Sequence, residues 1–125
     1  MEPTSQPENY AAPKPEELLK HLPAHIRERF TQFTVSRDPA AADEVVLAIV
    51  RDHVPARKHG TTPAMLTDNM SLTTDLGIDS VSIADAIFML EEVFDVSIAT
   101  KEIVRLSTIG DLRAFIRSKL AESHR

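Results

Sequence analysis

One serine in this chain stands at a position where a single hydroxyl could carry covalent chemistry. Ser80 ends the stretch 75–80, whose sequence is Asp-Leu-Gly-Ile-Asp-Ser, and an apolar run with helical spacing follows it. A short side-chain oxygen at a helix start accepts hydrogen bonds from the first free backbone amides, so we expect Ser80 to be the N-cap. An anion attached to the same oxygen would lie at the positive end of the helix. Gly77 permits a tight or left-handed turn before it, which leaves room for an enzyme that acts on Ser80. Leu76 and Ile78 are expected to anchor this turn inward.

The helix predicted to follow Ser80 carries two apolar stripes. The first recurs at helical spacing and should face the core. It consists of Ile83, Ile87, Leu90 and Phe94, with Ala86 and Val93 at its edge. The second stripe lies on the opposite side among acidic residues, where a helix that needed only solubility would not place Val and Phe. We therefore predict that this side binds partner proteins, and we call it the docking face: Val81, Ala84, Asp85, Phe88, Glu91 and Glu92.

These residues also carry a resemblance to a known family. Asp-Leu-Gly-Ile-Asp-Ser-Val at 75–81, followed by Leu-Glu-Glu-Val-Phe at 90–94, resembles the acyl carrier proteins of fatty-acid and polyketide synthesis. The resemblance extends from Asp43 to Leu120, and Val81 stands where the family usually has Leu. It implies that Ser80 carries 4′-phosphopantetheine, which a separate phosphopantetheinyl transferase takes from coenzyme A. The terminal thiol of that group would hold acyl chains as thioesters. Asp79 is implied to help bind the magnesium-bearing transferase complex.

The function implied by the resemblance is that of a carrier and not of an enzyme. It would serve a specialised fatty-acid, lipid or polyketide pathway, and its partners would be acyl-transferring or synthase enzymes with basic docking surfaces. Two alternatives remain open at this point. One is a peptidyl or aminoacyl carrier, and the other is an unmodified carrier-like module that only binds proteins. Asp79 before Ser80 and the acidic helix favour the acyl type, whereas Val81 weakens that preference.

The charge distribution also points to a protein partner. The chain has 125 residues and a net charge of −5. Seven acidic residues and no Lys or Arg lie between Lys58 and Lys101, so this block holds more negative charge than the whole chain does on balance. Such a block repels nucleic acid and anionic lipid and attracts a basic protein surface. We therefore predict no nucleic-acid binding and no direct membrane insertion.

Several other classes of site are excluded by composition. The chain has no Cys, which excludes disulfides and Cys-zinc sites, requires any thiol to come from a cofactor, and fits a reducing compartment. The longest aliphatic run, Val45–Val50, is too short to cross a membrane, and the N-terminus shows no signal-peptide pattern. We expect a cytoplasmic monomer. His21 and His25 are four residues apart but lack a third ligand, so no metal site is predicted, and with 3 Gly a nucleotide-binding loop is not expected.

The helical patterns predict a small all-α bundle with a long first loop, and the resemblance implies that it is an acyl-carrier-like four-helix bundle. We place this bundle at residues 38–123, after an N-terminal extension, residues 1–37. The extension is predicted to be partly disordered in its Pro-rich first part and to form short helices between Glu16 and Phe33, with a break at Pro23. Its apolar side is expected to pack partly on the bundle through the residues after Pro23. The alternative is that this side binds an enzyme and stays mobile in the free protein. That side consists of Leu18, Leu22, Ile26, Phe30 and Phe33.

Start and stop signals delimit the remaining helices. Asp38-Pro39 starts a helix that ends at Val54 before Pro55, with an apolar face of Val46, Ile49, Val50 and His53. The segment 55–74 then forms the long loop. The resemblance implies that this loop crosses the bundle and tucks apolar side chains beneath it, and the loop is expected to be longer than the family pattern around 57–63. Its apolar residues are Met65, Leu66, Met70 and Leu72.

Two helices are expected after the Ser80 helix. Thr100 is expected to cap a short helix over Lys101–Leu106. Thr108 and Asp111 resemble a capping box at the start of the last helix. The apolar face of that helix consists of Ile109, Leu112, Phe115, Ile116 and Leu120.

Overall fold

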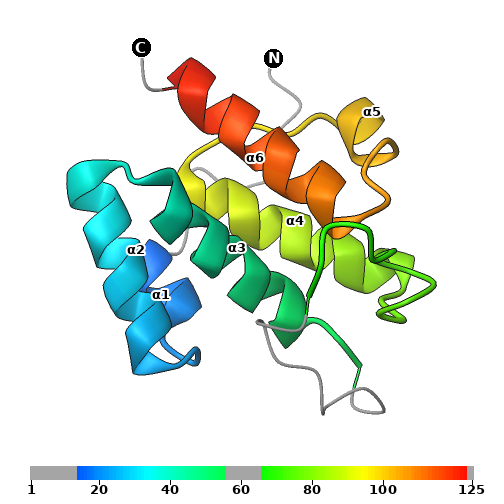
Figure 1. The fold of residues 1–125 in the computed structure, drawn as a ribbon, viewed down its shortest axis with the longest axis horizontal. Coiled ribbons are helices and arrows are strands. Elements are labelled where there is room, and N and C mark those ends of the chain that lie inside the picture. Colours follow the sequence, from blue (N-terminus) through cyan, green and yellow to red (C-terminus); the bar gives the residue numbers. More distant parts are fainter. Residues whose placement is uncertain (1–13, 56–65, 124–125) are drawn as a thin grey trace, which may run out of the picture.

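The computed structural model describes residues 14–55 and 66–123, and within these ranges it contains helices and no strand (Figure 1). The helices are α1 (Pro15–Leu19), α2 (Ala24–Ser36), α3 (Pro39–Asp52), α4 (Ser80–Phe94), α5 (Thr100–Ile103) and α6 (Ile109–Ser123). This confirms the all-α prediction. The predicted tail at 1–13, Met65 and the extra loop length around 57–63 lie outside the described residues. None of the helices in the described ranges has the length and apolar character needed to cross a bilayer.

Helix α3 lies at the centre of the fold and packs against α2, α4 and α6 (Figure 1). Its start is the predicted one, because the Asp38 carboxylate accepts a hydrogen bond from the Ala40 N–H at 3.0 Å and Pro39 is the first helical residue. The predicted face is buried except for His53, which is half-buried and lies just past the end of the helix. Burial of α3 is wider than one stripe because it also includes Ala41, Ala42, Val45 and Ala48.

The N-terminal extension packs into the same core as the bundle. Ile26, Phe30 and Phe33 are buried, as predicted. The Phe33 ring meets Phe94, the last residue of α4, edge to face with 5.5 Å between ring centroids. The Phe30 ring also meets Phe94 edge to face, with 6.3 Å between centroids. Two elements that lie far apart in the sequence therefore share aromatic contacts, and the added apolar area enlarges a small core.

The short helix α1 corrects one detail of the expected extension. Leu19 is only 1% exposed, whereas Leu18, which the spacing placed on the core side, is partly exposed. The reason is that Pro23 separates α1 from α2, so α1 has its own helical phase. Helix α1 packs against α4, with Leu19 buried.

The caps after α4 agree with the prediction at one helix and differ at the other. Thr108 and Asp111 form the predicted capping box, with the Asp111 N–H 3.1 Å from Thr108 Oγ1 and the Thr108 N–H 3.2 Å from Asp111 Oδ2. Thr100, however, is the first residue of α5 and not its cap, and α5 ends at Ile103. The Glu102 carboxylate, in the first turn of α5, accepts a hydrogen bond from the Ala99 N–H at 2.8 Å. This bond pairs one of the backbone amide groups that have no partner at a helix start.

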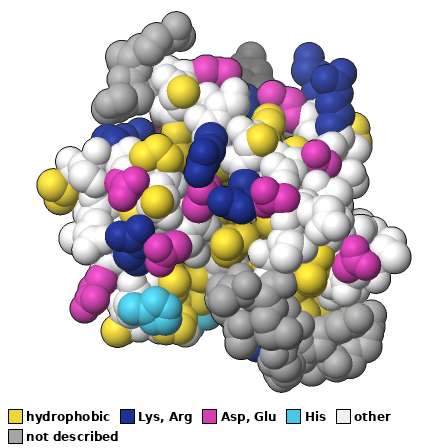
Figure 2. Space-filling model, in the orientation of Figure 1, with side chains coloured by type: hydrophobic (Ala, Val, Ile, Leu, Met, Phe, Trp, Pro, Cys, Tyr) yellow, Lys and Arg dark blue, Asp and Glu magenta, His cyan; other side chains and the backbone are white. Residues whose placement is uncertain are grey.

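A cluster of charged side chains joins α3 to α6. Asp43 on α3 is only 7% exposed, and its Oδ2 accepts from Arg113 Nη2 at 2.9 Å and from Arg117. Arg113 also donates to Asp68 at 2.7 Å. Lys or Arg and Asp or Glu side chains lie next to one another near the centre of the face in Figure 2, which views the molecule as Figure 1 does. This cluster was not predicted from the sequence. Arg113 and Arg117 are four residues apart and therefore lie on the same side of α6. No local sequence pattern predicts that they bind a carboxylate 70 and 74 residues away.

Candidate functional site

The loop that leads to Ser80 is attached to the start of α6. The Leu72 N–H donates to the Ser107 carbonyl at 2.9 Å, and the Ile109 N–H donates to the Met70 carbonyl at 3.0 Å. Leu66 and Leu72 are buried and Met70 is partly buried, as the expected apolar tuck requires. This part of the loop therefore holds the residues before α4 in a defined place.

The turn before Ser80 folds back on itself. The Ser71 N–H donates to Asp75 Oδ2 at 2.7 Å, and the Ile78 N–H donates to the Leu72 carbonyl at 3.0 Å. Gly77 has a φ of 71°, a left-handed conformation of the kind that glycine was expected to permit here. Leu76 and Ile78, on either side of Gly77, are buried, which confirms that the turn is anchored inward.

Ser80 is the first residue of α4 and is exposed to solvent. The expectation that Ser80 caps this helix is wrong, because the N-cap is Asp79. Asp79 has extended backbone angles, and its Oδ1 accepts from the Ser82 N–H at 2.8 Å. The Ser80 hydroxyl has no hydrogen-bond partner among the residues that the structure describes.

The cap also sets the electrostatics of the site. The Ser82 backbone N–H holds the pKa of Asp79 below its usual value, with smaller contributions from the Ser82 hydroxyl and the Val81 N–H. Asp79 is thus ionised at neutral pH, and its carboxylate already accepts the hydrogen bond of the Ser82 N–H. An anion on Ser80 would benefit from the helix dipole, but the Ser82 N–H would not be available to it.

The core beneath Ser80 is filled. The cavity at this end of α4 has a volume of about 10 Å³ and is lined by Val50, Leu72, Ile78, Ile83, Ala86, Ile87 and Leu112. A space of this size holds about one water molecule. The platform below the serine is therefore a packed apolar layer.

The predicted docking face lies along α4 beside Ser80. Val81 is 70% exposed and Phe88 is 43% exposed, and Ala84 and Asp85 are exposed with them. Glu92 is half-buried. The structure thus brings Ser80 together with these side chains on one helix.

Glu91, which was predicted only as a docking residue, forms a hydrogen bond within the fold. It is half-buried, and its Oε2 accepts from the Ile98 N–H at 2.7 Å. This bond attaches the segment after α4 to the last turn of α4, where Asp95 adopts a left-handed conformation with a φ of 56°. Glu91 therefore stabilises the end of α4 whether or not a partner is bound.

The described residues contain no group of three His, Asp or Glu side chains placed to hold a metal ion. His21, which the sequence pairs with His25 at ligand spacing, instead has its Nε2 2.8 Å from Asp52 Oδ2 on α3. That contact joins the extension to the bundle.

The chain is similar to known carrier proteins over most of the described fold. A family model described as phosphopantetheine attachment site matches residues 49–116, which is more than half of the chain. An acyl carrier protein of Exiguobacterium sp. is 35% identical over 77 residues, which are 62% of this chain and 96% of that protein. Acyl carrier proteins of Thermotoga maritima and Renibacterium salmoninarum are 29% and 35% identical, over 64% and 65% of this chain and 98% and 99% of their own lengths. The exposed serine at the start of α4 and these matches lead to one conclusion: this chain belongs to the acyl carrier protein family, whose prosthetic group is 4′-phosphopantetheine.

Proposed function

We propose that this chain is an acyl carrier protein that is modified at Ser80. In the modification, the Ser80 oxygen attacks the β-phosphate of coenzyme A, loses its proton and forms a phosphodiester. The pyrophosphate bond breaks, and adenosine 3′,5′-bisphosphate leaves. The bound arm then supplies a thiol that carries acyl groups as thioesters. The observation that carries this proposal is the exposed, unpaired Ser80 hydroxyl on the first residue of α4.

The residues around Ser80 have separate parts in this proposal. Asp79 orients the first turn of α4 through Ser82, and its second carboxylate oxygen can face a magnesium-bearing transferase complex. The docking face presents Val81 and Phe88 for apolar contact and Asp85 for attraction to a basic partner surface. We assign recognition of the phosphopantetheinyl transferase and of acyl-transferring or synthase enzymes to this face.

The extension supports a specialised role. The family model begins at residue 49, so α1 and α2 lie outside the matched part although they pack on α3 and α4. In this carrier, α1 and α2 cover part of the surface of α3 and α4, which a carrier without the extension would leave exposed. We propose a monomeric, cytoplasmic and non-catalytic carrier for a specialised fatty-acid, lipid or polyketide pathway.

Intact-mass measurement tests the modification. The full chain is incubated with coenzyme A, magnesium and a broad-specificity phosphopantetheinyl transferase. Wild type and the Ser82→Ala variant should each gain one phosphopantetheinyl group, and Ser80→Ala should gain none. Ser82 is the matched control because it is a serine two residues away on the same turn.

Each alternative has its own result in this experiment. A wild-type protein that gains no mass would support an unmodified interaction module. A Ser80→Ala variant that is still modified would place the arm elsewhere. The mass of the group carried by protein isolated from its native cells then separates an acyl carrier from an aminoacyl carrier.

A further inference from the structure

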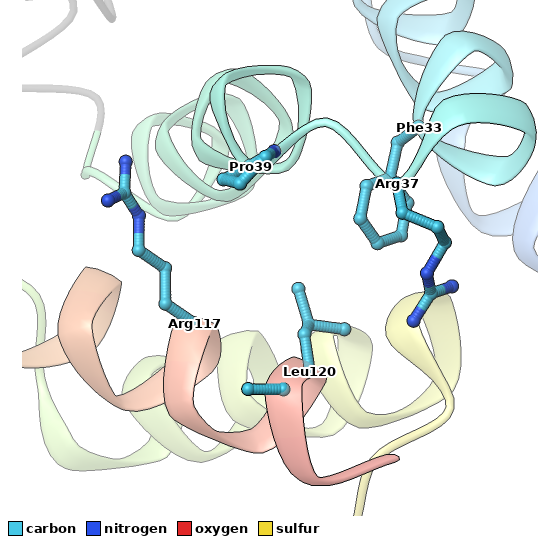
Figure 3. A pocket seen from close by; sticks show the side chains of 6 residues that line it. Phe33, Arg37, Pro39, Arg117 and Leu120 are labelled. Carbon is cyan, nitrogen blue, oxygen red and sulfur yellow. The ribbon is translucent and has the colours of Figure 1, made fainter. Parts of the chain in front are cut away.

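An apolar pocket lies at the end of the molecule away from Ser80. It has a volume of about 200 Å³, and its apolar walls are Phe33, Pro39, Leu120 and Ala121. Arg37 and Arg117 lie on opposite sides of it, on α2's end and on α6 (Figure 3). Phe33 also touches Phe94, the last residue of α4. Because α4 has 15 residues and rises 1.5 Å per residue, the pocket is about 20 Å from Ser80.

Arg37 is held at the pocket in an uncommon conformation. It directly follows the last residue of α2 and has a φ of 60°, at a position where helices usually have Gly because a side chain is disfavoured there. Its backbone N–H donates to the Phe33 carbonyl at 2.8 Å, and its guanidinium carbon lies 4.6 Å from the centre of the Phe33 ring. The side chain is thus placed over the apolar wall.

The two arginines differ in their charge partners. Arg117 is bound to Asp43 and belongs to the charged cluster between α3 and α6. Arg37 has no carboxylate partner among the described residues, and the adjacent Asp38 carboxylate accepts from the Ala40 N–H instead. The pocket therefore combines apolar walls with one cation, Arg37, that forms no ion pair with a carboxylate of the described residues.

The size of the pocket indicates what it can bind. Pockets for small-molecule ligands usually measure 300–1,000 Å³, whereas an apolar cavity of about 150 Å³ accepts a benzene ring. A volume of about 200 Å³ thus suits one large apolar side chain. Single side chains that fill such pockets are the usual anchors of protein interfaces.

We propose that this pocket is a second docking site, which takes a Phe-like side chain of a partner protein with a neighbouring carboxylate against Arg37. Its charge preference is opposite to that of the docking face on α4, which attracts basic surfaces. None of Phe33, Arg37, Leu120 and Ala121 lies within the residues matched by the family model. The site is independent of the modification, and Ser80→Ala should bind the same partner segment equally well.

A peptide titration followed by ¹⁵N–¹H NMR of the full chain tests this site. The probe is Ac-Glu-Phe-Glu-NH₂, compared with Ac-Lys-Phe-Lys-NH₂ and Ac-Glu-Ala-Glu-NH₂. We expect the first peptide to shift the amide signals of Phe33, Arg37 and Ala121 and to leave that of Phe88 in place. The lysine and alanine peptides should bind several-fold more weakly. Shifts of equal size with the lysine peptide, or none at these amides with the first, would overturn the proposal.

Variants separate the charge from the pocket. Arg37→Gln should weaken binding of the acidic peptide about three-fold, as expected for one exposed ion pair. Arg37→Gly, which suits the left-handed conformation, should do the same in a fully folded protein. Arg105→Gln removes the same charge from an exposed site after α5 and should change nothing. Ala121→Glu should abolish binding because it places a carboxylate on the pocket wall. Unchanged affinity in both Arg37 variants would overturn the assignment.

The remaining outcomes concern other occupants. Free 3-phenylpropionate that binds as tightly as the peptide would make this a site for a small acid and overturn the docking proposal. A large gain in peptide affinity on deletion of residues 1–13 would show that the chain fills its own pocket, and this would overturn the proposal. A sedimentation coefficient that rises with protein concentration in wild type but not in Ala121→Glu would show that a second copy fills it, and this would also overturn the proposal.

Discussion

The Oδ1 atom of Asp79 accepts a hydrogen bond from the Ser82 N–H at 2.8 Å and thereby caps the helix that Ser80 begins. The residue proposed for modification, Ser80, is therefore not the residue that stabilises the helix start, which is Asp79. This separation lets a large group occupy Ser80 without loss of the cap. It also predicts that Ser80→Ala melts within about 1 °C of wild type.

Removal of the cap should destabilise the protein. Asp79→Ala is expected to lower Tm by about 4 °C, and Asp79→Asn should restore most of the loss because Asn is also a good N-cap. Because the folded-state pKa of Asp79 is lowered, the ionised cap stabilises the fold above the ordinary Asp pKa, and this stability is lost as pH falls through the folded-state value. Thermal melts between pH 7 and pH 3 should show a smaller pH dependence in Asp79→Asn than in wild type. Equal Tm values for wild type and Asp79→Ala at pH 7 would contradict the cap assignment.

Charge reversal on the docking face should slow association with basic partners. The double variant Asp85→Lys, Glu92→Lys is expected to reduce the rate of modification by a transferase about ten-fold at low salt, and the difference should shrink at high salt. Glu28→Lys, on an exposed position of α2, is the matched control and should leave the rate unchanged. Stopped-flow or initial-rate measurements at two salt concentrations check this. If the double variant and the control behaved alike at low salt, the docking face would be elsewhere.

The extension should contribute to stability through its aromatic contacts. Phe33→Ala removes a side chain that is 3% exposed and packed against Phe94, so it should cost about 3–4 kcal/mol of unfolding free energy. Val35→Ala, two residues away and 81% exposed, should stay within about 0.5 kcal/mol of wild type. Deletion of residues 1–37 should lower Tm by more than Phe33→Ala does. Urea denaturation of the variants checks the values, and an unchanged Tm in the deletion would refute the packing of the extension.

The charged cluster predicts a second pH dependence. Burial opposes ionisation of Asp43, but hydrogen bonds from Arg117 and Arg113 outweigh it and hold the pKa of Asp43 below its usual value. Its contribution is thus fully present above the pKa of the unfolded chain, about 3.9, and is lost as pH falls through the folded-state value. Asp43→Asn should cost about 2 kcal/mol at pH 7, and the cost should shrink below pH 4.

A neighbouring acid serves as the control for Asp43. Glu44 forms an exposed ion pair with Arg29 at 3.0 Å, so Glu44→Gln should cost less than about 1 kcal/mol. Denaturation at pH 7 and pH 3 compares the two variants. A similar small cost for both would mean that the buried cluster contributes no more than a surface pair.

The sequence alone determined those features that depend on neighbours within one helical turn. The start of α3 at Asp38-Pro39, the capping box of Thr108 and the left-handed Gly77 follow from backbone amide groups and side chains a few residues apart. The buried stripe of α4 and the exposed Val81 follow from helical periodicity, which places residues on a side without reference to other helices. The motif around Ser80 indicated the family for a similar reason, since its two parts, 75–81 and 90–94, lie close together in the sequence.

Only the tertiary structure decided the features that join distant residues. Asp43 binds Arg117, which is 74 residues away in the sequence, and Phe33 packs against Phe94. Both contacts depend on how the helices pack against one another, which no local sequence pattern predicts. Leu19 became a core residue because α1 has its own phase. Even at the helix start, the structure shows Asp79 and not Ser80 as the cap, directly after the turn whose Leu76 and Ile78 are buried in the core. Local patterns specify which groups need a partner, and the packing of helices decides which partner is within reach.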